Sequence, residues 1–368
     1  MKKIFTVLTS IALTFALSFS AAFANDDALM KSQNYLKTIT LDSPDAVIAY
    51  EATGMEADYK ADALLNNFKE TDYVTASYGD LAKSIIAISL LGENPKDFNN
   101  NNLVEILENR IQEDGTLTND VNGGCGATIW TLMALETVNS PKVKAVADKL
   151  STMAMENGAY WYEYQGPNAD LDTTGWAMEA LSVAGRSTYK AAISKAYTFV
   201  QSKLNSTDGY YDNWGGNADT QSCVLEGLSV AGYTLDTNAY NYLLSYQNED
   251  GTFNALNYST GQLEPNAYAS VEGARALGVI NNGSFVLKAR QDYTKTTTPV
   301  VTEPETPTKP TKPSTTTPAV KPETTTTEPK KETVKVVNTG DNTNVMAYVV
   351  AAIAAVGVIV LVIKSKKK

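Results

Sequence analysis

Two stretches of the sequence, residues 178–185 (MEALSVAG) and 225–232 (LEGLSVAG), are identical at six of eight positions. They belong to a repeat with a period of about 46 residues. Five residues lie one period apart, and each stands at the start of an apolar run: Asp80, Gly126, Asp172, Asp219 and Asn266. A repeat of this length is a supersecondary unit that cannot bury its apolar face alone. We therefore expect stacked units, and a functional surface that several units build together.

Each unit predicts two helices. One is apolar around its whole circumference and should be buried on every side; these inner helices are expected at 44–52, 81–91, 127–138, 173–184, 220–231 and 267–277. The other is amphipathic and should form an outer layer, at 28–39, 59–70, 101–112, 141–155, 189–203 and 237–247. Six inner and six outer helices predict an all-α protein that closes into an α/α toroid. The alternative is an open HEAT-like array, whose repeat length is similar.

Long loops join each outer helix to the next inner helix, so they should gather at one end of the inner helices. Loops of this length are usually functional. Each begins with an acidic or amide residue and a glycine, which suits the left-handed turn that ends a helix: Asp114-Gly115, Asn157-Gly158, Asp208-Gly209 and Asp250-Gly251.

The fourth of these turns lies in the sequence QNEDGTF, residues 247–253. This stretch resembles the QW-type repeat of the terpenoid cyclase and protein prenyltransferase superfamily, with Phe253 in the tryptophan position. The resemblance covers about residues 25–292 and implies the α/α toroid. It does not imply one activity, because the superfamily includes squalene-type cyclases, prenyltransferase subunits, thioester domains and cobalamin-binding proteins.

The termini predict export and anchoring. Residues 1–24 have the basic start, apolar stretch and small-residue cleavage site of a signal peptide. After the folded part at 25–292, residues 293–337 are rich in Thr and Pro and should form a disordered stalk. Residues 338–368 contain an uncharged segment, 345–363, that is long enough to span a bilayer, and a lysine-rich tail.

Residues 336–340 (VVNTG) resemble a Gram-positive sortase sorting signal, which implies cleavage between Thr339 and Gly340. Val336 and Val337 replace the usual Leu-Pro. The chain is therefore expected on the extracellular face, attached to the cell wall or held in the membrane by its C-terminus.

Composition excludes several functions. The formal net charge of −11 argues against nucleic-acid binding. The absence of histidine excludes the zinc site of prenyltransferases and every histidine-based triad. Cys125 and Cys223 lie two repeats apart, too far for a disulfide. Cys125 resembles the start of a thioester motif, but Thr128 stands where the glutamine is needed. No cofactor is implied.

Two carboxylates are candidate catalytic residues. The sequence DLDT at 170–173 resembles the acid motif of squalene-type cyclases, which implies Asp172 as the general acid. The alternative role for Asp172 is a helix cap. A glycan-cleaving enzyme would instead pair Glu163 with Asp172 or Asp212. Glu179 and Glu226 align between repeats, and either join neighbouring helices or form a buried acid–base pair.

Aromatic loops are the strongest functional signal, because aromatic rings beside carboxylates and amides stack on a ligand and hydrogen-bond its rim. The candidate ligand-binding residues are Tyr160, Trp161, Tyr162, Tyr211, Asp212, Trp214, Phe253 and Tyr258. The alternative is that these rings pack beneath their own loops. Trp130 and Trp176 align within the inner helices and are expected in the core.

These patterns predict a cell-surface binding or adhesion module, with a small molecule, corrinoid or glycan at the loop-rich mouth of the toroid. The alternatives are an enzyme, either cyclase-like through Asp172 or glycan-cleaving, and a scaffold without a small ligand. The sequence leaves the ligand and the oligomeric state open.

Overall fold

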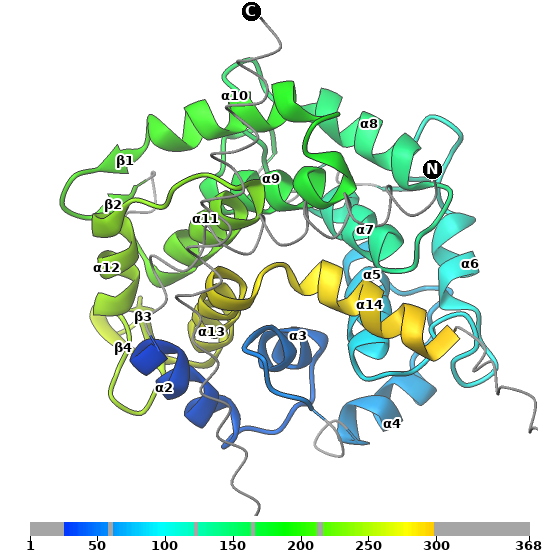
Figure 1. The fold of residues 1–368 in the computed structure, drawn as a ribbon, viewed down its shortest axis with the longest axis horizontal. Coiled ribbons are helices and arrows are strands. Elements are labelled where there is room, and N and C mark those ends of the chain that lie inside the picture. The colour runs from blue at the N-terminus through cyan, green and yellow to red at the C-terminus, as the bar shows by residue number, and fades with distance from the viewer. Residues whose placement is uncertain (1–25, 58–61, 121–123, 163–165, 212–215, 298–368) are drawn as a thin grey trace, which may run out of the picture. The chain divides into compact units, whose positions relative to one another are not determined.

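The computed structural model describes residues 26–57, 62–120, 124–162, 166–211 and 216–297. Within these ranges the chain forms thirteen helices and four short strands, so the prediction of an all-α protein is confirmed (Figure 1). None of the described helices is both long and apolar enough to cross a bilayer. The predicted signal peptide, most of the stalk, the sorting signal and the predicted membrane segment lie outside the described residues.

Six helices, which we call the central helices, form the core. Each contacts the next along the chain, and the last contacts the first. They are α3 (Pro44–Ala52), α5 (Tyr78–Leu90), α7 (Gly126–Thr137), α9 (Leu171–Gly185), α11 (Ala218–Ala231) and α13 (Ala267–Asn282).

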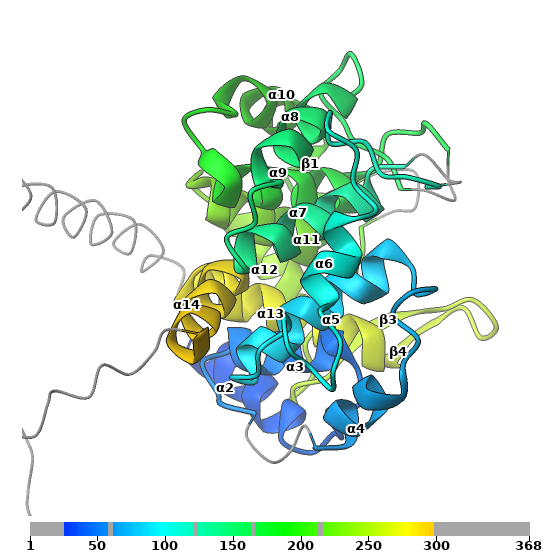
Figure 2. The same ribbon diagram turned by 90° about the vertical axis from the view of Figure 1, so that its right-hand side faces the viewer.

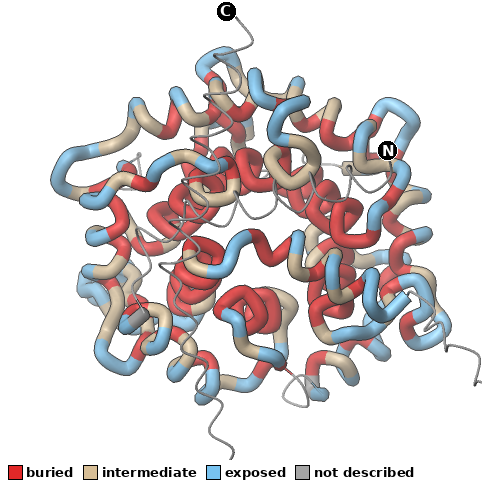
Figure 3. The backbone as a smooth tube through the Cα atoms, viewed as in Figure 1, coloured by how far each residue is buried: buried red, intermediate tan, exposed pale blue. Residues whose placement is uncertain are grey.

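The central helices are buried because their sequences offer no polar side. Every residue of α7 is buried, and buried positions run through all the central helices (Figure 3). This arrangement agrees with the sequence pattern, in which a helix apolar on all sides needs neighbours on all sides.

Six peripheral helices pack outside the central ones. Four of them, α6, α8, α10 and α12, each contact the central helix that precedes them in the chain. In α8 one face is buried, through Val146, Ala147 and Leu150, as the amphipathic pattern predicts. The peripheral helices are α2 (Asp26–Leu36), α4 (Asp62–Glu70), α6 (Leu103–Glu108), α8 (Val143–Met153), α10 (Lys190–Gln201) and α12 (Thr237–Ser245).

Helices α9 and α11 approach each other at two glycines. A Cβ atom added to Gly227 would lie 2.1 Å from the carbonyl oxygen of Gly175, and one added to Gly175 would lie 2.3 Å from the carbonyl oxygen of Cys223. Only glycine permits this distance between the two backbones. These glycines therefore set the spacing of the two helices that carry Asp172 and Asp219.

The cap of α9 differs from the predicted one. Asp170, not Asp172, is the N-cap residue, and its Oδ1 accepts a hydrogen bond of 2.7 Å from the backbone N–H of Thr173. In α11 the cap is likewise Asn217, and its side chain accepts from the N–H of Thr220. Asp172 and Asp219 are thus not needed as caps and lie in the first turns of their helices.

A final helix, α14 (Phe285–Thr297), was not predicted. It contacts α3, α5 and α7, and it extends past the predicted domain boundary at 292. Lys288 pairs with Glu51 at 2.6 Å, and Arg290 pairs with Glu136. Because Glu51 and Glu136 lie near the C-terminal ends of α3 and α7, α14 covers that end of these two helices.

The opposite end carries the long loops, and we call it the loop end. Two antiparallel hairpins form within these loops: β1 (Leu204–Asn205) pairs with β2 (Gly209–Tyr210), and β3 (Phe253–Asn257) pairs with β4 (Gln262–Asn266). Figure 2 shows the β3–β4 hairpin projecting on the side away from α14. The N-termini of the central helices meet at the loop end.

Candidate functional site

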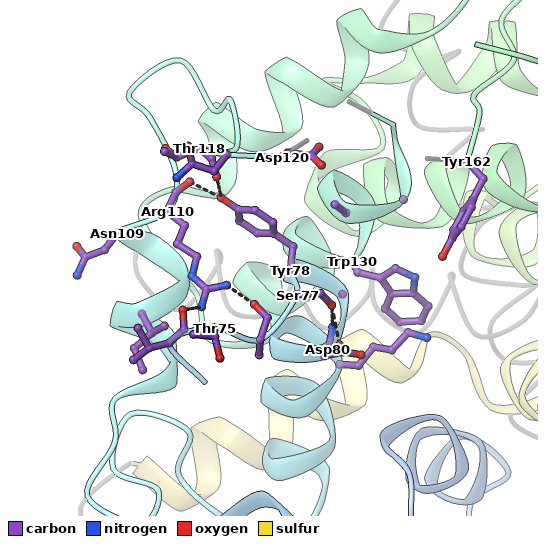
Figure 4. Close-up of a pocket in the computed structure, with 18 residues that line it drawn as sticks. Thr75, Ser77, Tyr78, Asp80, Asn109, Arg110, Thr118, Asp120, Trp130 and Tyr162 are labelled. Atoms are coloured by element: carbon purple, nitrogen blue, oxygen red, sulfur yellow. Dashed lines mark hydrogen bonds between the residues drawn. The ribbon is translucent and has the colours of Figure 1, made fainter. Parts of the chain in front are cut away.

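A pocket of about 830 Å³ opens at the loop end, between the first turns of α5 and α7 (Figure 4). Pockets of roughly 300–1,000 Å³ are typical of small-molecule sites. The side chains that give it its chemistry are Tyr78, Asp80, Lys83, Arg110, Trp130 and Tyr162.

Arg110 and Tyr78 hold one wall of the pocket in place. The guanidinium of Arg110 donates to the carbonyl oxygens of Tyr73, Val74 and Ala76 at 2.5–2.7 Å. The Tyr78 hydroxyl lies 2.6 Å from the carbonyl oxygen of Thr118 and 2.8 Å from that of Arg110. Burial raises the pKa of Tyr78. This wall is therefore formed before any ligand arrives.

Trp130 and Lys83 form the floor of the pocket. The Lys83 Nζ lies 4.5 Å from the centre of the Trp130 ring and 2.8 Å from Asp45 Oδ1. Trp130 also contacts Trp176 edge-on at 5.8 Å and Phe285 of α14 in a stacked arrangement at 6.3 Å. The floor thus connects the loop end to α14.

The charges favour a neutral or cationic ligand over an anion. Both cations of the pocket are already engaged, Lys83 with Asp45 and Arg110 with backbone carbonyls. Asp80 and Asp120 also line the pocket, and Asp80 accepts a hydrogen bond from the Ser77 hydroxyl at 2.7 Å. Among the described residues, no group of three or more potential ligands is placed to hold a metal ion.

The first turns of α9 and α11 place Asp172 and Asp219 at the loop end, outside the lining of the pocket. Asp219 Oδ1 is buried and has no hydrogen-bond partner in the described part of the chain. Burial, and then the charge of Glu272, raise the pKa of Asp219 to about 7. Carboxyl groups with such pKa values concentrate at functional sites.

Deeper between the helices lies a cluster of buried charges, which we call the arginine cluster. Arg275 donates from Nε to Glu226 at 3.0 and 3.1 Å, and from both terminal nitrogens to Glu272 at 3.0 Å. Beside it, burial and the neighbouring Glu226 raise the pKa of Glu179 well above its ordinary value. Glu179 accepts a hydrogen bond from the Ser284 hydroxyl. Glu226 therefore joins α11 to α13 through Arg275, and Glu179 with Glu226 also forms the buried carboxyl pair that the sequence left as the alternative.

The aromatic residues proposed from the sequence divide into two groups. Tyr160 and Phe253 are fully buried. Their backbone N–H groups donate to Thr174 and Ser270 of the neighbouring central helices, so these two rings anchor their loops and do not face the pocket. Tyr162 lines the pocket.

The other candidates lie elsewhere. Trp161 is partly buried, with its carbonyl accepting from the N–H of Cys125. Tyr211 is half-exposed, and Tyr258 is 83% exposed at the turn of the β3–β4 hairpin. The predicted residues outside the described ranges are Glu163, Asp212, Trp214, Thr339 and Gly340. Cys125 and Cys223 are both buried, and no disulfide joins them in the described structure.

Sequence reasoning missed Lys83, Arg110 and Tyr78. The repeat pointed toward this place, because Asp80 and Gly126 mark the starts of α5 and α7. The pairing of Tyr78 with a residue 32 positions away has no local signal.

Asp219 provides a stability test. An acid whose folded pKa is about 7, against an ordinary value of 3.8, destabilises the fold as pH rises between those values, because the unfolded chain releases its proton first. We expect Asp219→Asn to raise the free energy of unfolding by up to about 4 kcal/mol at pH 8, and by much less at pH 4. Urea denaturation at both pH values measures this.

The matched control is Asp97→Asn, at an exposed position, which should shift stability by less than about 0.5 kcal/mol at either pH. Equal stabilisation by Asp219→Asn at pH 4 and pH 8 would show that Asp219 is not the titrating group.

Comparison with known proteins gives no family. No family model matches the chain, and no curated protein matches it. Among solved structures, a protein from Actinoplanes is similar over 73% of this chain and 99% of its own, with 12% identity and a TM-score of 0.44. A similarity at this level supports no statement about function.

Proposed function

We propose that this protein is a ligand-binding module displayed outside the cytoplasm, and that it holds its ligand in the loop-end pocket. The observation that carries the proposal is the pocket itself: about 830 Å³, with a wall fixed by Arg110 and Tyr78 and a floor formed by Trp130. A site that is formed in advance loses little conformational entropy when it binds.

The fold that we propose for this module is an α/α toroid. Support comes from the cycle of contacts through the six central helices and from the peripheral helices outside them. In such a fold the long loops join the same ends of the central helices, so they gather at one end, where loops on a rigid scaffold can form a site.

The pocket chemistry favours a polar ligand. Its carboxylates, amides and tyrosines suit the hydroxyl and amide groups of a glycan or the amide rim of a corrinoid. A long isoprenoid would offer no hydrogen bonds to the polar lining, and it would cost about 1–3 kcal/mol for each lining group that it buries and that has no partner in the protein. We propose a glycan as the ligand, with a corrinoid as the first alternative to test.

Surface display is proposed from the terminal sequences. The signal peptide at 1–24 and the sorting signal at 338–368 would place the module on the extracellular face. Cleavage between Thr339 and Gly340 is tested by the mass of the chain released when the cell wall is digested.

The binding proposal is tested by ligand recovery. The full chain is incubated separately with wall glycan fragments, corrinoids and long isoprenoids, and retained material is identified by mass. Tyr162→Ala is expected to lower retention at least about tenfold, because a stacking contact is worth on the order of 1.4 kcal/mol.

Tyr258→Ala is the matched control, since it removes the same side chain from an exposed turn. Retention should stay at the wild-type level. Equal losses in the two variants, or no retention of any ligand by the wild type, would contradict a binding role for the pocket and favour the scaffold.

A second candidate function is an enzyme, and Asp219 favours it. A carboxyl group with a pKa of about 7 is suited to general acid–base catalysis near neutral pH. It would act beside Asp172, the acid expected from the cyclase-like motif. This candidate requires that the wild-type protein alters the ligand chemically in the recovery experiment. It also requires that the Asp172→Asn or Asp219→Asn variant leaves the ligand unaltered.

A further inference from the structure

The two cations of the loop-end pocket are already occupied by the protein itself. Lys83 Nζ lies 2.8 and 3.1 Å from the two carboxylate oxygens of Asp45, and it also lies over the ring of Trp130. The Arg110 guanidinium donates to three backbone carbonyl oxygens at 2.5–2.7 Å. Neither cation can turn toward a ligand without losing these bonds, so an anionic ligand would gain little from them.

The two carboxylates of the pocket are not occupied in this way. Asp80 and Asp120 both line the pocket, and neither forms an ion pair with a residue that the structure describes. Asp80 is exposed, and its Oδ2 accepts a hydrogen bond from the Ser77 hydroxyl at 2.7 Å. When Asp45 is counted with its partner Lys83, three carboxylates stand against two cations. The pocket therefore favours a ligand with a positive charge, and a protonated amine forms strong hydrogen bonds to carboxylates.

Tyr78 relates the two carboxylates to one wall of the pocket. It stands two residues before Asp80 in the first turn of α5. Burial, and also the negative charge of Asp120, raise the pKa of the Tyr78 hydroxyl, which is consistent with a position of Asp120 near that hydroxyl. Figure 4 shows Asp120 above the Tyr78 ring and Asp80 below it. A ligand that lies along this wall can therefore meet both carboxylates.

The aromatic contact for a ligand comes from Tyr162 more than from Trp130. Lys83 lies over the Trp130 ring, Phe285 stacks on it, and the indole is only 4% exposed. Tyr162 is partly buried and lines the pocket from the loop that follows α8. In Figure 4 its ring stands across the pocket from Arg110. An aromatic ring packs against the apolar face of a sugar and also attracts a cation.

We propose that the pocket selects sugars that carry free amino groups, and that Asp80 and Asp120 pair with these groups in their protonated form. The inference rests on the proposed binding function and names its ligand class. Hydroxyl and amide side chains that suit the sugar hydroxyls also line the pocket: Thr75, Ser77, Asn109 and Thr118. N-acetylation removes the positive charge of the amine, so an N-acetylated sugar of the same length loses the pairing with the carboxylates.

The test compares the β-1,4-linked trimer of glucosamine with that of N-acetylglucosamine, by calorimetric titration of the full chain at pH 6, where a sugar amine is protonated. In low salt the glucosamine trimer is expected to bind about tenfold more tightly, because only it forms charge-assisted hydrogen bonds. At roughly 1 M salt, where charges are screened beyond about 3 Å, this preference should shrink. Equal affinities in low salt would overturn the amine assignment and leave the pocket as a glycan site.

Asp80→Asn and Asp120→Asn each remove one charge and keep the size of the side chain. Each is expected to weaken the glucosamine trimer about fivefold, the ~1 kcal/mol of a partly exposed charge pair, and to leave the N-acetylated trimer unchanged. The matched control is Asp97→Asn, which removes the same charge at an exposed position outside the pocket. An equal loss in Asp97→Asn would show that only the overall charge of the protein attracts the amine, and the proposal would fail.

Each variant is first checked for folding by its thermal midpoint, and Asp120→Asn stays informative if Asp80→Asn destabilises α5, because Asp120 lies outside the helices. A trilysine peptide serves as an amine without a sugar ring. Weaker binding of this peptide than of the glucosamine trimer supports the sugar class, and equal or tighter binding overturns it. Binding of neither trimer overturns the glycan assignment. If the recovery experiment then retains a corrinoid, the binding module stands with another ligand, and if it retains nothing, the proposed function fails too.

Discussion

Replacement of Arg275 by methionine is expected to lower the free energy of unfolding by about 3–5 kcal/mol, since removing one partner from a buried ion pair leaves an uncompensated charge. Arg275, Glu226 and Glu272 are all essentially inaccessible to solvent. Without the guanidinium, the two carboxylates would have to take up protons or admit water. Urea denaturation at pH 7 measures the loss.

The control is the triple variant Glu226→Gln, Glu272→Gln and Arg275→Met, which removes the charges together. It should recover most of the stability, because replacing a whole buried ion cluster is often close to neutral. A change below about 1 kcal/mol in the single variant would show that the cluster is hydrated in solution.

The second large effect is expected at α14. Phe285 is 1% exposed and stacks on Trp130. Phe285→Ala should lower the free energy of unfolding by about 3–5 kcal/mol, because it leaves a cavity between α14 and the central helices. It should also change the tryptophan fluorescence of the folded protein.

Leu287→Ala on the same helix is the matched control. Leu287 is 40% exposed, so its truncation should cost less than about 1 kcal/mol. If the two variants lose equal stability, α14 is not packed through its Phe285 face.

The helical fold could be predicted from the sequence because its signal is local and repeated. The stretches at 178–185 and 225–232 coincide with the C-terminal halves of α9 and α11, and apolar residues on every side require a central position. The helix α14 gave no such signal. Its apolar residues alternate with Lys288 and Arg290. These two cations form ion pairs with Glu51 and Glu136, which are distant in the sequence and come close to α14 only in the folded chain.

The candidate site could be predicted only in part. Sequence analysis placed function in the long loops at one end, and Tyr162 lines a pocket there. It could not separate Tyr162 from Tyr160, two residues earlier, because the fold alone determines which of the two rings is buried. Lys83 and Trp130, on different central helices, approach within 4.5 Å only after both helices have packed.

Because α14 packs against α3, α5 and α7 and its Phe285 stacks on Trp130, the pocket meets packed side chains behind Trp130. A long polymer bound in this pocket would therefore have to leave by the loop end, where it entered. Only short molecules, or the free ends and branches of a longer chain, can reach Trp130. The amount of protein that binds a polysaccharide should then scale with the number of its chain ends and not with its mass. Shearing a glycan into fragments would therefore create binding sites for this protein.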